Sequence, residues 1–259
     1  MGERLKNKVA IVTGGSAGIG EATCEVFAEE GAQVVIADIA DEQGQAVADK
    51  IKQAGGEALF IHADIASDDQ AQRLIAETVK AFGTVDVLVN NAATFVLKGV
   101  EATVADWMKS LSVNVIGTAL VTKYAVEAMK LNDGGKGKGA VVNLASISGL
   151  IAQPNFLTYS ATKAALIQMT KNLALDLAPF NIRVNAVCPA TILTRASHDH
   201  MERTGQSLAD FLAEQGPAHL LNRVGQPREV AYPILFLASD EASFITATHL
   251  MVDGGYIAR

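Results

Sequence analysis

The chain has 259 residues, of which 49% are hydrophobic and 19% are charged, so it can bury a sizeable core and is not expected to be disordered. Its formal net charge of −7 argues against general affinity for nucleic acids or anionic membranes. No apolar run reaches the roughly 20 residues of a membrane-spanning helix, and no signal peptide precedes the first expected strand. We therefore predict a cytoplasmic protein with neither a nucleic-acid partner nor a membrane partner.

Short apolar runs alternate with helical patterns along the chain. The first run, Val9–Val12, is unbroken, which is typical of a strand buried on both faces of a parallel sheet. Further strands are expected over 34–37, 58–61, 85–89, 140–144, 182–187 and 250–252, and helices over 18–30, 41–54, 68–82, 104–129, 155–178 and 228–237. This alternation predicts one α/β domain over residues 1–259, with a doubly wound parallel sheet of about seven strands and helices on both faces.

One polar segment, residues 194–222, interrupts this rhythm. It contains charged and histidine side chains and the pair Gly216-Pro217. Insertions at the carboxyl edge of a parallel sheet commonly control access to a ligand. We therefore predict that residues 194–222 form a substrate-binding lid.

A glycine-rich turn follows the first expected strand and precedes a helix. Gly14, Gly18 and Gly20 permit a tight turn, so backbone N–H groups can approach a pyrophosphate at the positive end of the helix. Asp38 ends the next strand, where a carboxylate can bind the hydroxyls of an adenine ribose. The same carboxylate would repel a 2′-phosphate, and Ala17 and Ile39 offer no compensating charge. These residues favour NAD over NADP.

Tyr159 and Lys163 are four residues apart on an expected helix and so share one face. A free tyrosine has a pKa of about 10, too high for a base at neutral pH. Lowering this pKa by about 3 requires about 4 kcal/mol. A positive charge about 4 Å away supplies that amount at an effective dielectric constant of about 20. The pair is therefore predicted to transfer a proton.

The expected chemistry is the oxidation of an alcohol or the reduction of a ketone. Such a reaction needs a base for the O–H proton and an acceptor for the hydride, and the Ser146 hydroxyl can orient the reacting oxygen. Neither the two cysteines, Cys24 and Cys188, nor the five histidines are spaced like metal ligands, so no metal is expected.

Several motifs together resemble the short-chain dehydrogenase/reductase family over residues 8–256. They are Thr13-Gly14 through Gly20, Asp64, Asn90-Asn91-Ala92-Ala93, Asn114, Ser146, Tyr159 with Lys163, Pro189 with Thr194, and Asp253-Gly254-Gly255. The resemblance implies a Rossmann-type fold, and it implies a homotetramer. Apolar residues on several faces of the helix that follows Tyr159 also favour a second copy as partner.

The resemblance also implies a role for each residue. Tyr159 would be the general acid/base, Lys163 would bind the nicotinamide ribose and lower the pKa of Tyr159, Ser146 would bind the substrate oxygen, and Asn114 would hold a water of a proton relay. The implied cofactor contacts are Gly14, Ser16, Gly18, Ile19, Gly20, Asp38, Asp64, Ile65, Asn91, Tyr159, Lys163, Pro189, Ile192 and Thr194. The expected substrate contacts are Ser146, Ser148, Gln153 and Phe156, with Phe95 and Thr191 nearby.

Three alanines stand where the family usually has glycine. They are Ala93, Ala190 and Ala247. If these positions require a positive φ angle, each alanine costs about 1 kcal/mol.

The leading hypothesis is an NAD-dependent secondary-alcohol dehydrogenase for a small polar substrate such as a sugar, polyol or hydroxy acid. One alternative is an NADPH-dependent reductase of 3-oxoacyl thioesters. Another is a non-catalytic NAD(H)-binding oligomer, which is disfavoured because the chain keeps Asn114, Ser146, Tyr159 and Lys163 together.

Overall fold

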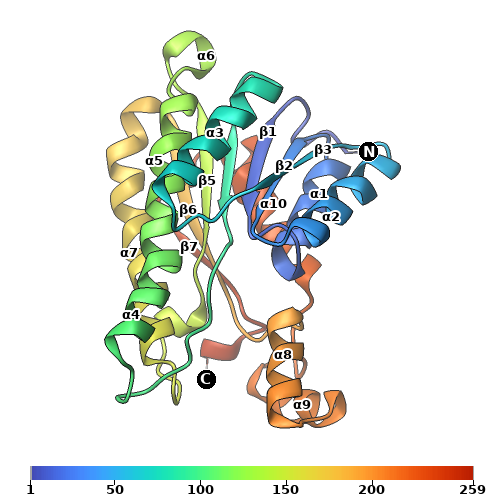
Figure 1. Cartoon of the computed structure of the whole chain (residues 1–259), viewed down its shortest axis with the longest axis vertical. Helices are drawn as coiled ribbons and strands as arrows, with labels where there is room; N and C mark the ends of the chain where they lie inside the picture. The colour runs from blue at the N-terminus through green and yellow to red at the C-terminus, as the bar shows by residue number, and fades with distance from the viewer. Residues whose placement is uncertain (1, 259) are drawn as a thin grey trace.

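The protein is described by a computed structural model that covers residues 2–258. Its centre is one all-parallel, seven-stranded sheet with the order β3-β2-β1-β4-β5-β6-β7 (Figure 1). The strands are β1 (Val9–Thr13), β2 (Gln33–Asp38), β3 (Glu57–His62), β4 (Val87–Asn90), β5 (Gly139–Leu144), β6 (Ile182–Pro189) and β7 (His249–Val252). The predicted Rossmann-type α/β fold is therefore confirmed.

Helices cover both faces of the sheet, as the sequence predicts. The helices that cover the faces are α1 (Gly18–Glu29), α2 (Asp41–Gln53), α3 (Asp68–Phe82), α5 (Thr118–Met129), α7 (Leu157–Leu177) and α10 (Pro227–Ala238). The structure also contains α4 (Val104–Leu111), the short α6 (Asn132–Gly135), α8 (Arg195–Thr204) and α9 (Leu208–Gln215). None of these helices, within residues 2–258, has the length and apolar character needed to cross a bilayer.

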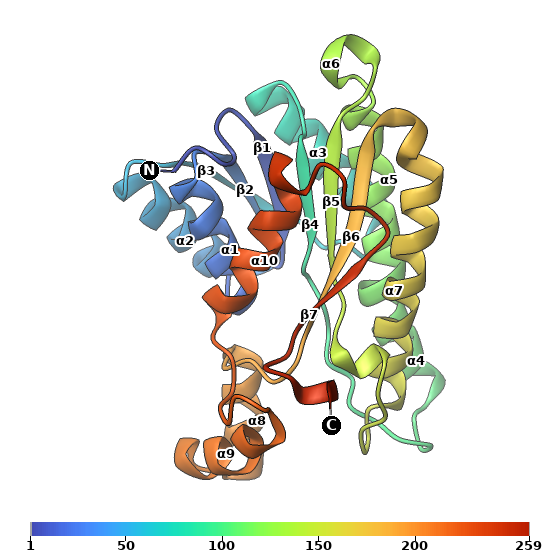
Figure 2. The same ribbon diagram turned by 180° about the vertical axis from the view of Figure 1, so that it is seen from behind.

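Alternate residues of each strand face opposite layers of helices. Ala10 and Val12 of β1 pack in a core with α1, α2 and α10, whereas Ile11 packs in a second core with α3, α5 and α7. Figure 2 shows α1 and α10 in front of the sheet, and Figure 1 shows α3 and α5 in front of its other face. Because both faces are covered, central strands such as β1 are buried along their whole length.

The helix predicted across residues 104–129 is present but is not regular. A π-helical segment, Ser112–Gly117, separates α4 from α5. Gly117 lies against the backbone of Ile65, where a Cβ atom would come within 2.9 Å of the Ile65 carbonyl oxygen. π-Helical turns are frequent at functional sites, and this one contains Asn114.

Residues 194–222 form two helices beyond the carboxyl ends of the strands (Figure 1). Thr194 begins α8 with a capping box that includes Ser197, and the Ser207 side chain accepts a hydrogen bond from the Asp210 N–H at the start of α9. Met201 and Phe211 pack with Val224 in a small core of their own. The segment is thus a compact unit attached at the edge of the sheet.

Of the three alanines in place of glycine, only Ala247 has a positive φ angle. Its φ is +62°, and its N–H donates a hydrogen bond of 2.8 Å to the carbonyl of Val184 in β6. Ala93 and Ala190 do not have positive φ angles. The expected conformational cost therefore applies at one position, just before β7.

Replacing Ala247 with Gly should stabilise the protein. Relief of the left-handed strain is worth about 1 kcal/mol, and the greater freedom of glycine in the unfolded chain offsets part of it. We expect the free energy of unfolding to rise by about 0.5 kcal/mol. Denaturant titration of Ala247→Gly beside Ala190→Gly, which should not gain stability, measures this. Equal changes in the two variants would contradict the argument.

Candidate functional site

The residues singled out from the sequence gather at the carboxyl edge of the sheet. The glycine-rich turn follows β1, Asp38 ends β2, Ser146 follows β5, and Pro189 ends β6. The order of the strands reverses at β1, whose neighbours are β2 and β4. Parallel α/β sheets commonly bind ligands at such a switch point.

The glycine-rich turn requires glycine for steric reasons. Gly14 and Gly18 have φ angles of +64° and +58°. A Cβ atom at Gly20 would lie 2.0 Å from the carbonyl oxygen of Gly14, and one at Gly14 would lie 2.8 Å from the Cα of Ala92. The Asn91 amide also donates to the carbonyl of Gly14, at 2.8 Å. This backbone cradle at the start of α1 fits a dinucleotide diphosphate.

Asp38 is fixed beside this turn. Its two carboxylate oxygens accept hydrogen bonds of 3.1 Å from the N–H groups of Ser16 and Ala40. The following residue, Ile39, is 65% exposed. Its side chain is uncharged, so no cation stands at this position to neutralise the carboxylate. A carboxylate held in this way suits the hydroxyls of an adenine ribose better than a phosphate.

The other expected cofactor contacts occupy the same edge. Asp64 follows β3 and is exposed, and its carboxylate accepts a hydrogen bond from the Ala66 N–H at 3.0 Å. Ile65 is buried. Ile192 forms an isolated bridge with Gly225. A Cβ atom at Gly18 would lie 3.3 Å from Thr194, so the start of α8 lies against the glycine-rich turn.

Tyr159 lies on α7 between two phenylalanine rings. The ring of Phe95 stacks on it with centroids 4.9 Å apart, and Phe156 meets it edge-on at 6.0 Å. Burial raises the pKa of Tyr159 above its ordinary value, while a hydrogen bond with Ser146 acts in the opposite direction. The structure thus differs from the expectation that the pKa of this phenol is lowered.

The charge of Lys163 does not offset this effect of burial in the structure. The Lys163 ammonium donates a hydrogen bond of 2.6 Å to the carbonyl of Leu144 and lies 5.5 Å from the ring centroid of Tyr159. The side chain is buried, which lowers the pKa of Lys163 to about 8. Spacing places the ammonium on the correct face of α7, but the carbonyl of Leu144, from a different part of the chain, fixes where it points.

Asn114 connects the π-helical segment to α7. Its side-chain oxygen accepts from the Thr94 N–H at 2.8 Å, and its amide donates to the carbonyl of Thr94 and to the hydroxyl of Thr162, each at 3.0 Å. The Thr162 hydroxyl donates in turn to the carbonyl of Tyr159 at 2.8 Å. The sequence reasoning missed Thr94 and Thr162. The position of Thr162 beside Lys163 in the Tyr159–Lys163 motif was the available signal.

Ser146, Ser148 and Gln153 form a chain of hydrogen bonds beside Tyr159. The Ser146 hydroxyl donates to that of Ser148 at 3.1 Å and accepts from the Ser148 N–H at 3.1 Å. The Ser148 hydroxyl donates to the side-chain oxygen of Gln153 at 2.5 Å. Three of the predicted substrate contacts are therefore linked to one another, and Phe156 lies against Tyr159.

Cys188 is a neighbour that the sequence reasoning did not assign to the site. Burial raises the pKa of its thiol to about 11, although the charge of Lys163 and the backbone N–H of Ser146 both lower it. The thiol is therefore neutral at physiological pH, and Cys188 packs with Ala145, Leu166 and Ile167.

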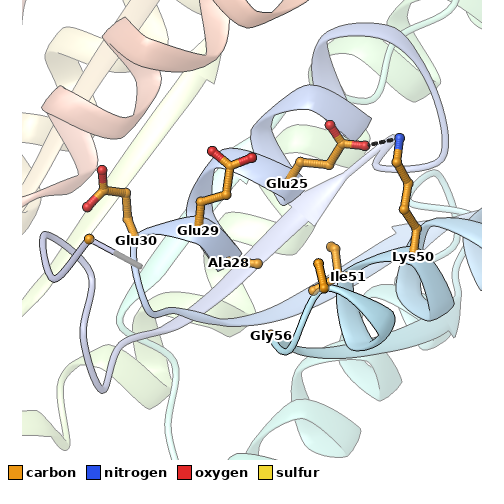
Figure 3. A pocket seen from close by; sticks show the side chains of 9 residues that line it. Glu25, Ala28, Glu29, Glu30, Lys50, Ile51 and Gly56 are labelled. Carbon is orange, nitrogen blue, oxygen red and sulfur yellow. Dashed lines mark ion pairs between the residues drawn. The ribbon is translucent and has the colours of Figure 1, made fainter.

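A pocket of about 420 Å³ lies elsewhere, between α1 and α2 (Figure 3). Glu25 and Glu29 of α1 face it, and Lys50 of α2 forms an ion pair with Glu25. Its walls include the carboxyl-terminal ends of both helices, so it opens toward the amino edge of the sheet. It does not coincide with the residues around Tyr159. Among residues 2–258, no three His, Cys, Asp or Glu side chains lie together in a way that could hold a metal ion.

Comparison with known proteins gives one family match. A family model described as enoyl-(acyl carrier protein) reductase matches residues 14–257. An uncharacterized oxidoreductase of Thermotoga maritima is 40% identical over 255 residues, covering 98% of this chain and 99% of its own. Cyclopentanol dehydrogenase of Comamonas testosteroni is 39% identical, with 99% of both chains covered. Cis-4-hydroxycyclohexanecarboxylate dehydrogenase of Sinomonas cyclohexanicum is 39% identical, with 100% of both chains covered.

Proposed function

Because the chain belongs to the short-chain dehydrogenase/reductase family of oxidoreductases, we propose that it interconverts a secondary alcohol and a ketone with NAD as its cofactor. The observation that carries the proposal is the position of Tyr159, Ser146 and Lys163 at the same sheet edge as the glycine-rich turn. The family implies a nicotinamide cofactor, NAD or NADP.

In the proposed mechanism the cofactor, when bound, accepts or supplies the hydride. Tyr159 takes the alcohol proton on its phenolic oxygen in oxidation and returns it to the ketone oxygen in reduction. Ser146 hydrogen-bonds the reacting oxygen and holds it beside Tyr159. Phe95 and Phe156 exclude water from the phenol by covering its ring.

Lys163 and Asn114 have supporting roles in this mechanism. The buried ammonium of Lys163 lies 5.5 Å from the ring centroid of Tyr159 and would bind the hydroxyls of a nicotinamide ribose. With the cofactor bound, its positive charge would favour the phenolate form of Tyr159. Asn114 connects the π-helical segment to Thr94 and to Thr162, which precedes Lys163 on α7. We propose that Asn114 also holds the water of a proton relay.

The cofactor would lie along the carboxyl edge from Asp38 to Thr194. Its diphosphate would meet the N–H groups of the glycine-rich turn, and the adenine ribose would meet Asp38. The proposed contacts are Gly14, Ser16, Gly18, Ile19, Gly20, Asp38, Asp64, Ile65, Asn91, Tyr159, Lys163, Pro189, Ile192 and Thr194. The preference for NAD rests on Asp38, because its carboxylate would repel the extra phosphate of NADP.

The substrate is proposed to be a small cyclic alcohol with a polar substituent, of which a hydroxy acid is one example. Two relatives are named for cyclic alcohols, cyclopentanol and 4-hydroxycyclohexanecarboxylate. Phe95 and Phe156 offer an apolar surface beside the phenol of Tyr159, and Ser148 and Gln153 offer polar groups. The segment 194–222 would act as the lid over this substrate, within a single domain.

Binding and turnover measurements test the function. The purified protein is titrated with NAD and with NADP and is then assayed with cyclic alcohols, sugars, polyols, hydroxy acids and 3-oxoacyl thioesters. Tight binding of NAD with oxidation of a cyclic alcohol is the expected result. NADPH preference with thioester reduction would instead establish the alternative activity. NAD binding without turnover of any alcohol or ketone would favour a non-catalytic, NAD-binding oligomer.

We also propose that the protein is a cytoplasmic homotetramer. Apolar side chains remain exposed on α7, which packs on β6, and on α4, which packs on α7. Leu175 of α7 is 76% exposed, and Met108 of α4 is 51% exposed. A second copy would cover them. A light-scattering mass equal to one chain would refute the oligomer.

A further inference from the structure

The hydroxyl chain beside Tyr159 ends at a side chain that can reverse its direction. Ser146 and Ser148 are 8% and 5% exposed, so bulk water does not compete for their hydroxyl groups. Each hydroxyl has one hydrogen to donate. In one sense of the chain Ser146 donates to Ser148 and Ser148 donates to the Gln153 side-chain oxygen, so neither hydrogen is directed at Tyr159. Ser146 can donate to Tyr159, the sense that lowers the pKa of the phenol, only when its single hydrogen is not on Ser148.

The proposed reaction requires Ser146 to donate as well. A ketone oxygen carries no hydrogen, and the oxygen of an alcohol becomes negatively charged as its proton leaves, so both are stabilised by a donor. Ser146 can donate to the reacting oxygen only if its hydrogen turns away from Ser148. The chain then runs in the opposite sense, from the Gln153 amide to Ser148, from Ser148 to Ser146, and from Ser146 to the substrate.

A glutamine side chain supports both senses because it has a carbonyl oxygen and an NH₂ group. The backbone of Gln153 is held in the turn before α7, where its carbonyl accepts a hydrogen bond from the Phe156 N–H at 3.3 Å. Its side chain is half-buried, with the oxygen on Ser148. Rotation of the amide alone would exchange the acceptor for a donor, and no covalent bond changes.

We propose that Gln153 is a positioning residue that sets the direction in which the Ser146 hydroxyl donates. This inference rests on the proposed function, since it assigns Ser146 to the reacting oxygen. In it, Gln153 acts through Ser148 and does not need to touch the substrate.

Replacing Gln153 with Glu tests the proposal, because a carboxylate can accept but cannot donate. The variant should lock both serine hydrogens toward position 153. We expect kcat/KM to fall about 10- to 100-fold, equally for alcohol oxidation and ketone reduction because the equilibrium constant is unchanged, with the Kd for NAD unaltered. Gln72→Glu makes the same change on an exposed part of α3 and should leave kcat/KM unchanged.

A double-mutant cycle separates the relay from a general effect of the new charge. Ser148→Ala removes the link between Gln153 and Ser146. In protein that already carries Ser148→Ala, adding Gln153→Glu should therefore lower kcat/KM by less than about twofold. If the losses in Gln153→Glu and Ser148→Ala instead multiply, the two residues act independently and the proposal is wrong.

Fluorine NMR supplies a readout that does not depend on turnover. Protein labelled with fluorotyrosine should show a Tyr159 resonance, identified by its absence in Tyr159→Phe, that shifts in Ser148→Ala and in Gln153→Glu but not in Gln72→Glu. If these shifts occur and no alcohol or ketone reacts, the relay stands and the proposed function fails. If substrates react but the resonance stays in place in Gln153→Glu and Ser148→Ala, the relay fails and the function stands.

Discussion

Replacing Tyr159 with Phe should lower kcat/KM for the alcohol by about 10³-fold or more, because the variant has no group to take the hydroxyl proton. The phenylalanine ring would keep the stacking with Phe95 and the edge contact with Phe156, so the fold and the Kd for NAD should change little. Steady-state kinetics and a cofactor titration measure the two effects separately.

The matched control for this prediction is Tyr232→Phe. Tyr232 is 50% exposed on α10 and accepts a hydrogen bond of 3.4 Å from Arg228. Loss of the Tyr232 hydroxyl should leave kcat/KM within about twofold of the value for the unmodified protein, since exposed groups away from the reaction contribute little. Near-normal turnover by Tyr159→Phe would overturn the proposed mechanism.

Replacing Lys163 with Met should make the protein more stable at neutral pH while nearly abolishing turnover. Burial lowers the pKa of Lys163 from 10.5 to about 8, which corresponds to roughly 3 kcal/mol of penalty on the charged form. The variant leaves the carbonyl of Leu144 without its hydrogen bond, which costs about 1 kcal/mol. We therefore expect a gain of about 2 kcal/mol in the free energy of unfolding.

The difference in stability should depend on pH with a defined sign. Between pH 8 and 10.5 the unfolded Lys163 binds more protons than the folded one, so the stability of the unmodified protein rises with pH in this window. Below the window the full penalty remains, and above it the penalty is absent. The advantage of Lys163→Met should thus disappear and reverse by about pH 10.5. Denaturant titrations of both proteins at several pH values test this, and a constant difference would contradict it.

Local sequence patterns were sufficient for the fold. The apolar runs of β1 and β2 and the glycines between β1 and α1 predict a parallel sheet because each reports a local requirement: burial on both faces, or a backbone without a Cβ atom. Asp38 and Tyr159 lie in short local motifs as well, so their position at the carboxyl edge of the sheet could be predicted from the sequence. Their roles in the reaction stay predictions.

Features that depend on contacts between distant segments were not predicted. The orientation of Lys163 depends on the carbonyl of Leu144, and the position of Asn114 depends on Thr94 and Thr162. The strain at Ala247 became visible only with its φ angle, because Ala93 and Ala190 are the same residue type without that conformation. Such features require the positions of hydrogen-bond partners that have no fixed sequence spacing.

The π-helical segment Ser112–Gly117 lets the continuous helix from α4 to α5 pack against two different helices, α7 and α3. A π turn contains one residue more than an α turn, and each residue of a regular helix rotates about 100°. The segment therefore shifts the rotational phase of α5 relative to α4. Before it, α4 contacts α7, and after it, α5 contacts α3. Deleting a single residue here would restore a uniform phase and turn Thr118 and Thr122 away from Asn90 and the sheet, so the length of this segment is constrained in addition to its residues Asn114 and Gly117.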